Sequence, residues 1–326
     1  MSGPDPSRIV QIAVGYMAAK QLFAASGAGL FAALADKPLA VAELAESTGL
    51  PVSTTRILGD SMSSLGLLSR VDGRYALSPD AAAHLAGEAS GVDLRPFLAF
   101  LDQISYPHWQ QFERTVRTGG PGELDLEGQR WSTFLSGVMT YNALHAEVLA
   151  AQFDFGPYRE VLDLGGLSSA FAVRAMRAND SLRTTFVIDP NSVEPVRQAV
   201  AEAGLADRSV VLGEATPTAR PLGSFDLVLV NHVVHRFTAE QNSAILANAR
   251  AAAAPGARLL LLDFFLDEDE QPRALDALHA GEYLVIDGTV VYPEREVRSW
   301  LDETGWRTVD RLTLPGCPRV LIAEAV

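Results

Sequence analysis

The sequence predicts an α/β protein made of a winged-helix module followed by a Rossmann-like domain with a mostly parallel, seven-stranded sheet. Before residue 80, two short helical runs precede a strong hairpin signal. After residue 160, short β-rich runs alternate with helical runs, which is the pattern of a doubly wound sheet. The length of 326 residues agrees with two domains, because a single hydrophobic core rarely grows to that size.

The composition narrows the class of protein. A hydrophobic fraction of 48% with 20% charged residues is that of a folded globular chain. The net charge of -14 argues against a general nucleic-acid binder and against attachment to anionic lipid. The polar start and the lack of a long apolar run predict neither a signal peptide nor a membrane span, so we expect a cytoplasmic protein. The single cysteine, Cys317, excludes an internal disulfide and a cysteine-based zinc site.

The first 104 residues read as the winged-helix module. Helical spacing over residues 8–35 is interrupted at Gly27 and Gly29. The next helix is short and stops at Gly49, and another begins near Ser53, where a serine or threonine can cap it. Two β-rich runs then flank Asp72-Gly73, the dipeptide that most strongly signals a two-residue hairpin turn.

A winged helix can also be a DNA-binding module, and the charge distribution tests that alternative. Residues 1–104 have a net charge of -3, which leaves -11 for the rest of the chain. The helix that would read DNA contains Arg56 as its only basic residue, beside Asp60. Because phosphate contacts dominate DNA affinity, we expect no nucleic-acid partner.

Residues 105–155 are expected to form connecting helices that line a substrate pocket. They are rich in aromatic residues and are interrupted by a polar, glycine-rich stretch at 118–129. Packing in the core accounts for most such aromatic residues, and His84, His145 and His279 read as ordinary surface or packing histidines. The side chains predicted to face the pocket are His108, Trp109, Phe112, Trp131, Met139, Asn142 and His232.

The domain over 156–326 is expected to bind its ligand at the carboxyl ends of its strands. After the first strand, Asp163 precedes Gly165-Gly166, a turn that lets backbone approach a ligand at a helix N-terminus. Asp163 could equally be a helix cap, and Asp189 could be a plain turn residue. The prediction gains weight because successive strands each bring a polar residue to the same edge, namely Asp163, Asp189, Glu214, Asn231 and Asp263.

His235 is the most informative single residue. It lies 28 residues before Asp263, one strand–helix–strand unit, so both should sit at the ends of neighbouring parallel strands. A histidine held by a carboxylate is a suitable general base near neutral pH. Two alternatives remain open: an ordinary core or loop histidine, and a metal site formed with His232 and Asp263. We favour a site without metal, because nothing in the sequence places His232 on the same side.

These features together resemble the SAM-dependent O-methyltransferases of bacterial secondary metabolism and plant phenolic pathways. In that family a winged-helix dimerisation domain precedes a class I methyltransferase domain. The similar segments are residues 29–79, the VLDLGG turn at 161–166, and the stretch from FDLVLVNHVVHRF to ARLLLLD at 225–263. The resemblance implies a homodimer, a small-molecule substrate and S-adenosyl-L-methionine (SAM) as the cofactor.

Carried over position by position, the resemblance assigns roles to the edge residues. It implies His235 as the catalytic base and Asp263 as its supporting acid. Cofactor binding falls to Asp163, Gly165, Gly166, Asp189, Glu214 and Asn231, with Asp189 at the ribose and Glu214 beside the adenine.

The glycine turn departs from the family pattern. The family usually has two further glycines where this chain has Leu167 and Ser169. If position 167 needs a positive φ, leucine there costs about 1–2 kcal/mol, which would weaken the hold on SAM. Two functions therefore stay open. The first is methyl transfer to a hydroxyl of an aromatic or polyketide-like molecule. The second is a non-methylating step, such as isomerisation, dehydration, cyclisation, decarboxylation or hydroxylation, on a biosynthetic intermediate.

Overall fold

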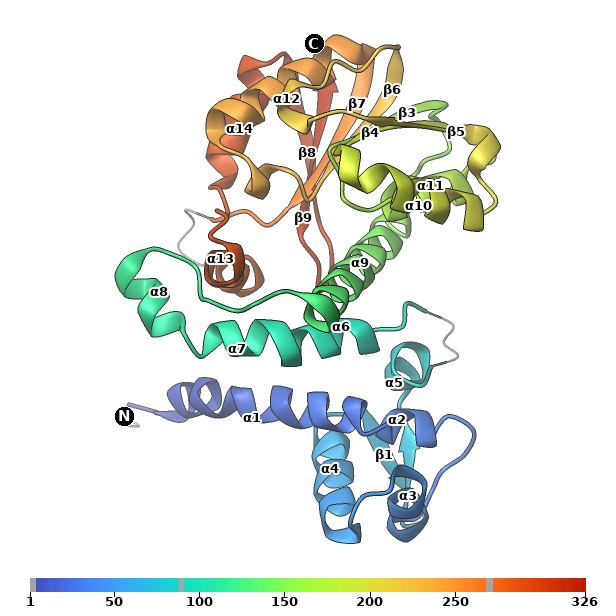
Figure 1. Ribbon diagram of the computed structural model, residues 1–326, viewed down its shortest axis with the longest axis vertical. Helices are drawn as coiled ribbons and strands as arrows, with labels where there is room; N and C mark the ends of the chain where they lie inside the picture. The colour runs from blue at the N-terminus through green and yellow to red at the C-terminus, as the bar shows by residue number, and fades with distance from the viewer. Residues whose placement is uncertain (1–3, 88–90, 268–271) are drawn as a thin grey trace. The chain divides into compact units, whose positions relative to one another are not determined.

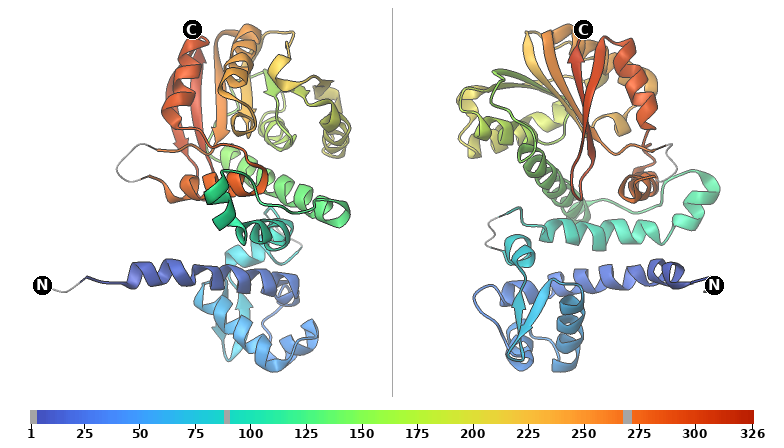
Figure 2. Two further views of the ribbon diagram at one scale, coloured as in Figure 1. Left: turned by 60° about the vertical axis from the view of Figure 1, so that its left-hand side comes forward. Right: turned by 180° about the vertical axis from the view of Figure 1, so that it is seen from behind.

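The computed structural model describes residues 4–87, 91–267 and 272–326, and the chain divides into two compact units. The first unit contains residues up to 107 together with 124–141, and the second contains 108–123 and 142–326. Figures 1 and 2 show the helices of the first and the sheet of the second. Among the described residues, no helix has the length and apolar character that a membrane crossing requires.

The first unit is a winged helix, as predicted. Asp72 and Gly73 both have positive φ, 50° and 76°, which is the backbone that a two-residue hairpin turn needs. Its core gathers Leu30, Phe31 and Met62 around the ring of Tyr75. The elements are α1 (Ser7–Gly27), α2 (Leu30–Ala33), α3 (Val41–Thr48), α4 (Val52–Ser64), β1 (Leu68–Val71), β2 (Arg74–Leu77), α5 (Pro79–His84), α6 (Arg95–Phe100) and the π-helical turn η1 (Leu101–Ser105).

One local prediction in this unit is wrong. Helix α4 has Pro51 at its N-cap, so no serine or threonine side chain caps it near Ser53. The hydroxyls of Thr54 and Thr55 instead donate to the Pro51 carbonyl, at 2.9 and 3.0 Å. Proline sets the backbone geometry at this end of the helix, so a capping side chain is not required.

The second unit is built on the predicted seven-stranded sheet, in the order β5-β4-β3-β6-β7-β9-β8. All neighbouring strands are parallel except β7–β9 and β8–β9, which are antiparallel. The strands are β3 (Glu160–Leu164), β4 (Arg183–Ile188), β5 (Ser209–Gly213), β6 (Phe225–Asn231), β7 (Ala253–Asp263), β8 (Trp306–Thr313) and β9 (Arg319–Ala325).

Helices and short turns connect these strands. Helix α12 ends at Ala252, shortly before the Pro255-Gly256 pair. That pair lies inside β7, where the β6–β7 register shifts between Phe225 and Leu227. The connecting elements are α10 (Ala170–Ala178), η2 (Pro190–Ser192), α11 (Val193–Glu202), η3 (Ala206–Arg208), η4 (Thr216–Thr218), η5 (Val234–Arg236), α12 (Ala239–Ala252), α13 (Ala274–Asp287) and α14 (Glu294–Glu303).

Three helices of the predicted connecting region complete the chain. Helix α8 (Phe112–Thr118) lies in the second unit, whereas α7 (Tyr106–Trp109) and α9 (Gly128–Ala150) each contain residues of both units. The glycine-rich interruption predicted at 118–129 separates α8 from α9.

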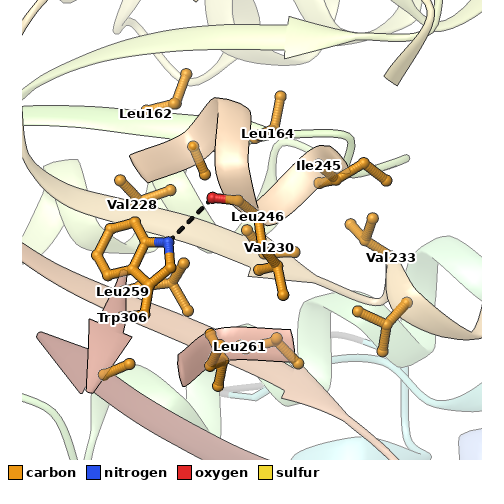
Figure 3. Close-up of a cluster of buried hydrophobic side chains, with 14 of the residues drawn as sticks. Leu162, Leu164, Val228, Val230, Val233, Ile245, Leu246, Leu259, Leu261 and Trp306 are labelled. Atoms are coloured by element: carbon orange, nitrogen blue, oxygen red, sulfur yellow. Dashed lines mark hydrogen bonds between the residues drawn. The ribbon is translucent and has the colours of Figure 1, made fainter. Parts of the chain in front are cut away.

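Buried apolar side chains on the two faces of the sheet hold the second unit together. Figure 3 shows one of these clusters, in which Leu162, Val228 and Leu259 from three adjacent strands pack with Trp306. The Trp306 indole N–H donates to the Leu246 carbonyl at 3.0 Å, so this large buried side chain leaves no polar atom unpaired. A rigid core of this kind fixes where each strand ends, and so fixes the loops at the carboxyl edge.

Candidate functional site

The strand order reverses between β3 and β6, and two turns flank that point. The first, here called the glycine turn, is residues 165–169 after β3. The second, here called the histidine turn, is residues 232–236 after β6. Ligands of open α/β sheets bind at this place, because the loops diverge there and leave a crevice at the carboxyl ends of the strands.

His235 and Asp263 form a hydrogen-bonded pair at this edge. The His235 Nδ1 atom lies 3.0 and 3.1 Å from the two carboxylate oxygens of Asp263. Strands β6 and β7 pair in parallel with Asn231 opposite Leu262, which brings the residues that follow each strand together. The predicted spacing of 28 residues is therefore realised as a direct contact.

Neighbouring groups set the pKa of Asp263 and thereby the tautomer of His235. Asp263 is fully buried, and burial alone would raise the pKa of its carboxyl group. Two interactions oppose burial: the attraction and hydrogen bond of His235, and the Phe264 backbone N–H, which donates to Asp263 at 2.9 Å. Together they outweigh burial and hold the pKa of Asp263 below its usual range. An ionised Asp263 accepts the Nδ1 proton, so Nε2 is the basic nitrogen of His235. The ring of Tyr283 packs against the imidazole, with 4.4 Å between ring centroids.

Two further imidazoles lie beside this pair. His232 has a φ of 55°, unusual for a residue other than glycine, and its backbone N–H donates to the Leu262 carbonyl at 2.8 Å. His232 Nε2 lies 2.9 Å from His145 Nδ1. Burial lowers the pKa of His232 to about 4 and lowers the pKa of His145 well below its usual value. Both rings are therefore neutral near pH 7, and His145 is a buried histidine that packs against His232.

The tertiary structure also brings together the three residues considered as a metal site. One donor atom from each of His232, His235 and Asp263 lies within 4.8 Å of the others. Their side chains already make other contacts, because Asp263 accepts from His235 and His232 lies against His145. A site without metal therefore stays our prediction.

The backbone of the glycine turn approaches its neighbours closely. Gly165 has a φ of 77°, and a Cβ atom there would lie 2.4 Å from Thr216 Cγ2. The positions that depart from the family pattern are not strained: among the described residues, positive φ outside glycine occurs at Asp72 and His232, so Leu167 has an ordinary backbone. Ser169 begins helix α10 as its N-cap residue, so the alternative of Asp163 as a helix cap is wrong.

Two buried polar groups at this edge lack partners within the described part of the chain. Asp163 Oδ2 makes no hydrogen bond, and burial raises the pKa of this carboxyl group to about 7. Asn231 accepts from the Leu262 N–H at 3.3 Å through Oδ1, while its Nδ2 atom makes no hydrogen bond. Leaving such groups unsatisfied costs free energy, so they mark a place where a ligand would be favoured.

Asp189 and Glu214 stand at the ends of β4 and β5. The Asp189 carboxylate accepts from the Asn191 backbone N–H at 2.9 Å, so the turn role considered for it is real. The same Oδ1 atom accepts from both the backbone N–H and the side-chain amide of Asn191. Glu214 accepts from the Arg220 N–H at 3.0 Å. Both side chains are only half-buried, which leaves carboxylate oxygens able to accept from ligand hydroxyl or amino groups.

The residues predicted to line a substrate pocket are distributed over both units. His108 and Asn142 are buried in the second unit, where the Trp109 indole packs on Phe112 with 4.5 Å between ring centroids and bonds to Glu282 on α13. Trp131 and Met139 belong to the first unit, and Trp131 is 47% exposed and stacked on Phe134. A pocket shared by the full set stays a prediction.

Three residues at the site have roles that the sequence did not indicate. Tyr283 comes from α13, His145 from α9, and Arg236 follows His235 directly and donates to the Gly165 carbonyl at 2.7 Å. Arg236 offered a signal, because it stands where the resembled family commonly has an aspartate. Tyr283 and His145 offered none, since their helices are far from β6 in the sequence.

Two family models and several known proteins match this chain. An O-methyltransferase domain model matches residues 112–307, and an O-methyltransferase dimerisation domain model matches residues 10–87. The chain is 28% identical to the tetracenomycin polyketide synthesis 8-O-methyl transferase TcmO of Streptomyces glaucescens, over 95% of this chain and 94% of that one. It is 29% identical to the 3-hydroxy-5-methyl-1-naphthoate 3-O-methyltransferase of Streptomyces sahachiroi, over 97% and 94%. The apo crystal structure of the S-adenosylmethionine-dependent methyltransferase SibL superposes with a TM-score of 0.83 at 29% identity, covering 98% of this chain and 99% of that one.

Proposed function

Because the chain belongs to the O-methyltransferase family, we propose that it transfers the methyl group of SAM to a hydroxyl group of an aromatic or polyketide-like natural product. The hydrogen-bonded pair His235–Asp263 at the edge of the sheet is the observation that carries the proposal. The relatives TcmO and the naphthoate 3-O-methyltransferase, both named for methylating a hydroxyl of an aromatic or polyketide substrate, support this acceptor class. No feature of the site favours the non-methylating alternative.

The residues at the edge fit SAM. The partnerless Asp163 oxygen and Asn231 amide nitrogen would meet polar groups of a ligand that passes over the glycine turn. Asp189 would accept from the ribose hydroxyls, and Glu214 would lie beside the adenine. Gly165 and Gly166 would allow the ligand to approach the backbone, and Leu167, whose side chain is 37% exposed, places no strained backbone in its way. When bound, SAM supplies an electrophilic methyl group.

His235 would accept the proton of the substrate hydroxyl at Nε2 as the oxygen becomes nucleophilic. Asp263 fixes the Nδ1–H tautomer and stabilises the imidazolium that forms, because its own pKa is held low. Tyr283 keeps the imidazole in its orientation by packing against one face of the ring. Orientation of this kind lowers the barrier, since the oxygen and the methyl group must meet in line.

Two further parts of the proposal concern assembly and location. We expect two chains to pair through the N-terminal module, which the dimerisation domain model matches at residues 10–87. Large apolar side chains of α1 support this expectation, since Ile9, Ile12 and Tyr16 are 72%, 69% and 54% exposed. Native mass spectrometry would show a monomer if this is wrong. A biosynthetic enzyme that uses SAM also fits the predicted cytoplasmic location.

The test of the reaction is a His235→Ala variant assayed with SAM and a panel of phenolic polyketide intermediates. Formation of S-adenosylhomocysteine (SAH), followed by mass spectrometry, should fall by about 10²–10⁴-fold. SAH affinity, measured by calorimetry, should stay within about threefold. His84→Ala is the matched control, because His84 bonds to the Val92 carbonyl in the first unit. An unimpaired His235→Ala enzyme would refute the assigned base, and a wild type that binds neither SAM nor SAH at millimolar concentration would refute the proposed function.

A further inference from the structure

The guanidinium of Arg236 lies against the glycine turn. Arg236 is the last residue of η5 and follows His235 directly. Its Nη1 atom donates to the Gly165 carbonyl at 2.7 Å, across 71 residues of sequence. A single side chain therefore connects the turn that carries the base with the turn that the cofactor would cross.

This guanidinium has hydrogen-bonding capacity to spare. A guanidinium carries five N–H donors, and the bond to Gly165 uses one of them. Within the described residues, no carboxylate lies at ion-pair distance from Arg236. Its flat face rests on Phe237, with 5.2 Å from the guanidinium carbon to the ring centroid. The ring holds the side chain in place without neutralising its charge.

The charge of Arg236 is poorly compensated. Burial lowers its pKa from the ordinary arginine value, and the attraction of Asp189, Asp263 and Asp287 acts in the opposite direction without cancelling burial. A partly desolvated cation that lacks a direct counter-ion is costly in free energy. A ligand group that is negatively charged and able to accept two parallel hydrogen bonds would relieve that cost.

Among the groups of SAM, only one has that chemistry. The sulfonium and the ammonium groups are cations, which a guanidinium repels. The ribose hydroxyls suit the carboxylates of Asp189, and the adenine is neutral. The carboxylate of the methionine portion carries the negative charge and the planar pair of oxygens that match the arginine fork.

We propose that Arg236 binds the carboxylate of the methionine portion of the cofactor and thereby holds it over the glycine turn. This proposal rests on the proposed function, because it assumes SAM as the cofactor. It gives the chain an added contact at the turn where Leu167 and Ser169 replace two glycines of the family pattern. Asp163 lies two residues before Gly165, at the end of β3. Its oxygen without a partner among the described residues independently indicates a ligand at this turn.

The test compares two ligands that differ only in the carboxylate. One is SAH, and the other is its decarboxylated analogue, which keeps the adenosine, the sulfur and the amine. Calorimetry with wild type and Arg236→Gln measures both affinities without relying on turnover. Glutamine removes the charge, and its side chain ends short of the Nη1 position of Arg236, so any effect of losing the Gly165 contact falls on both ligands alike. We expect SAH to bind the variant roughly 10- to 100-fold more weakly, while the analogue changes by less than about threefold.

Arg250→Gln is the matched control, because Arg250 also donates to backbone carbonyls, those of Gly305 and Val326, in the same unit. It should leave both affinities unchanged. Equal weakening of SAH and the analogue in Arg236→Gln would overturn the proposal and make Arg236 a residue that only shapes the turn. Unchanged affinities, or a wild type that binds both ligands equally, would overturn it as well. If wild type binds neither ligand, the proposed function fails instead.

Discussion

Two arginines of the second unit, Arg319 and Arg236, differ in how the chain compensates their positive charge. Arg319 is almost fully buried at the start of β9, and its guanidinium bonds to the carboxylates of Asp267, Glu294 and Asp276 at 2.5, 2.9 and 3.1 Å. Burial opposes the charge of Arg319, but these carboxylates outweigh it and raise its pKa. Among the described residues, Arg236 makes one hydrogen bond, to the Gly165 carbonyl, and burial lowers its pKa.

The difference distinguishes a structural charge, Arg319, from one that we propose is placed for a ligand, Arg236. Arg319 connects the segment after β7 with α13 and α14, because three carboxylates of the chain accept from its two terminal nitrogens. Its Nε atom has no partner among the described residues. At the edge between β3 and β6, the chain leaves Arg236 without a counter-ion and Asp163 Oδ2 and Asn231 Nδ2 without partners among the described residues. Unsatisfied polar groups reduce stability, and they cluster where function requires them.

The largest expected effect is the loss of the paired arginine. Arg319→Ala removes the cation that three carboxylates share. Asp267 loses its ion-pair partner, whereas Asp276 keeps Arg273 and Glu294 keeps Arg298 and Arg311, so the free energy of unfolding should fall by about 3 kcal/mol. Arg236→Ala should lower it by no more than about 1.5 kcal/mol, because one hydrogen bond is lost. Urea denaturation of both variants measures the contrast. Equal losses would show that Arg236 is as structural as Arg319.

The second prediction concerns the turn that Arg236 contacts. Gly165→Ala should lower the free energy of unfolding by about 2–4 kcal/mol. The positive φ of this position is strained for alanine, and the added Cβ would clash with Thr216. Gly204→Ala is the matched control: its φ is 72°, but no atom lies within 4 Å of the added Cβ. Only the strain cost of about 1–2 kcal/mol should appear there. Thermal unfolding that gives equal costs would contradict the close approach at Gly165.

The smallest predicted effect is a rise in the free energy of unfolding rather than a fall. The Asp163 carboxyl has an ordinary pKa of 3.8, which burial raises to about 7 in the folded chain. Between these values the unfolded chain binds fewer protons than the folded chain, so stability falls as pH rises from about 4 to 7. Asp163→Asn removes this loss and should raise the free energy of unfolding at pH 8 by about 1–3 kcal/mol.

Denaturation of wild type and Asp163→Asn at pH 5 and pH 8 tests that sign, and calorimetry should show weaker SAH binding by the variant. Asp226→Asn is the control with a paired carboxylate, since Asp226 accepts from the Arg159 and Glu160 N–H groups at 2.8 and 3.0 Å. It should lose about 1 kcal/mol at pH 8. If Asp163→Asn is destabilising at pH 8, Asp163 has a structural partner in the folded chain.

Much of the fold could be predicted, because short-range sequence patterns determine where its strands, helices and turns occur. The strand–helix alternation predicted the sheet, and Asp72-Gly73 predicted the wing, because both depend on short-range backbone preferences. His235 and Asp263 could be paired from their spacing, since one crossover connection places consecutive parallel strands side by side. The error at the cap of α4 concerns a helix boundary, which the conformation of one residue decides.

The sequence by itself determined the fold class, the edge of the sheet that carries the site, and the His235–Asp263 pair. Only the tertiary structure decided that His145 meets His232, that Tyr283 packs on the base, and that Arg236 reaches Gly165. The reason is physical. Local preference and spacing fix where strands and turns occur, whereas the partners of a side chain depend on which distant helices pack there. Whether a buried charge such as Asp163 or Arg236 finds a partner is settled by that packing alone.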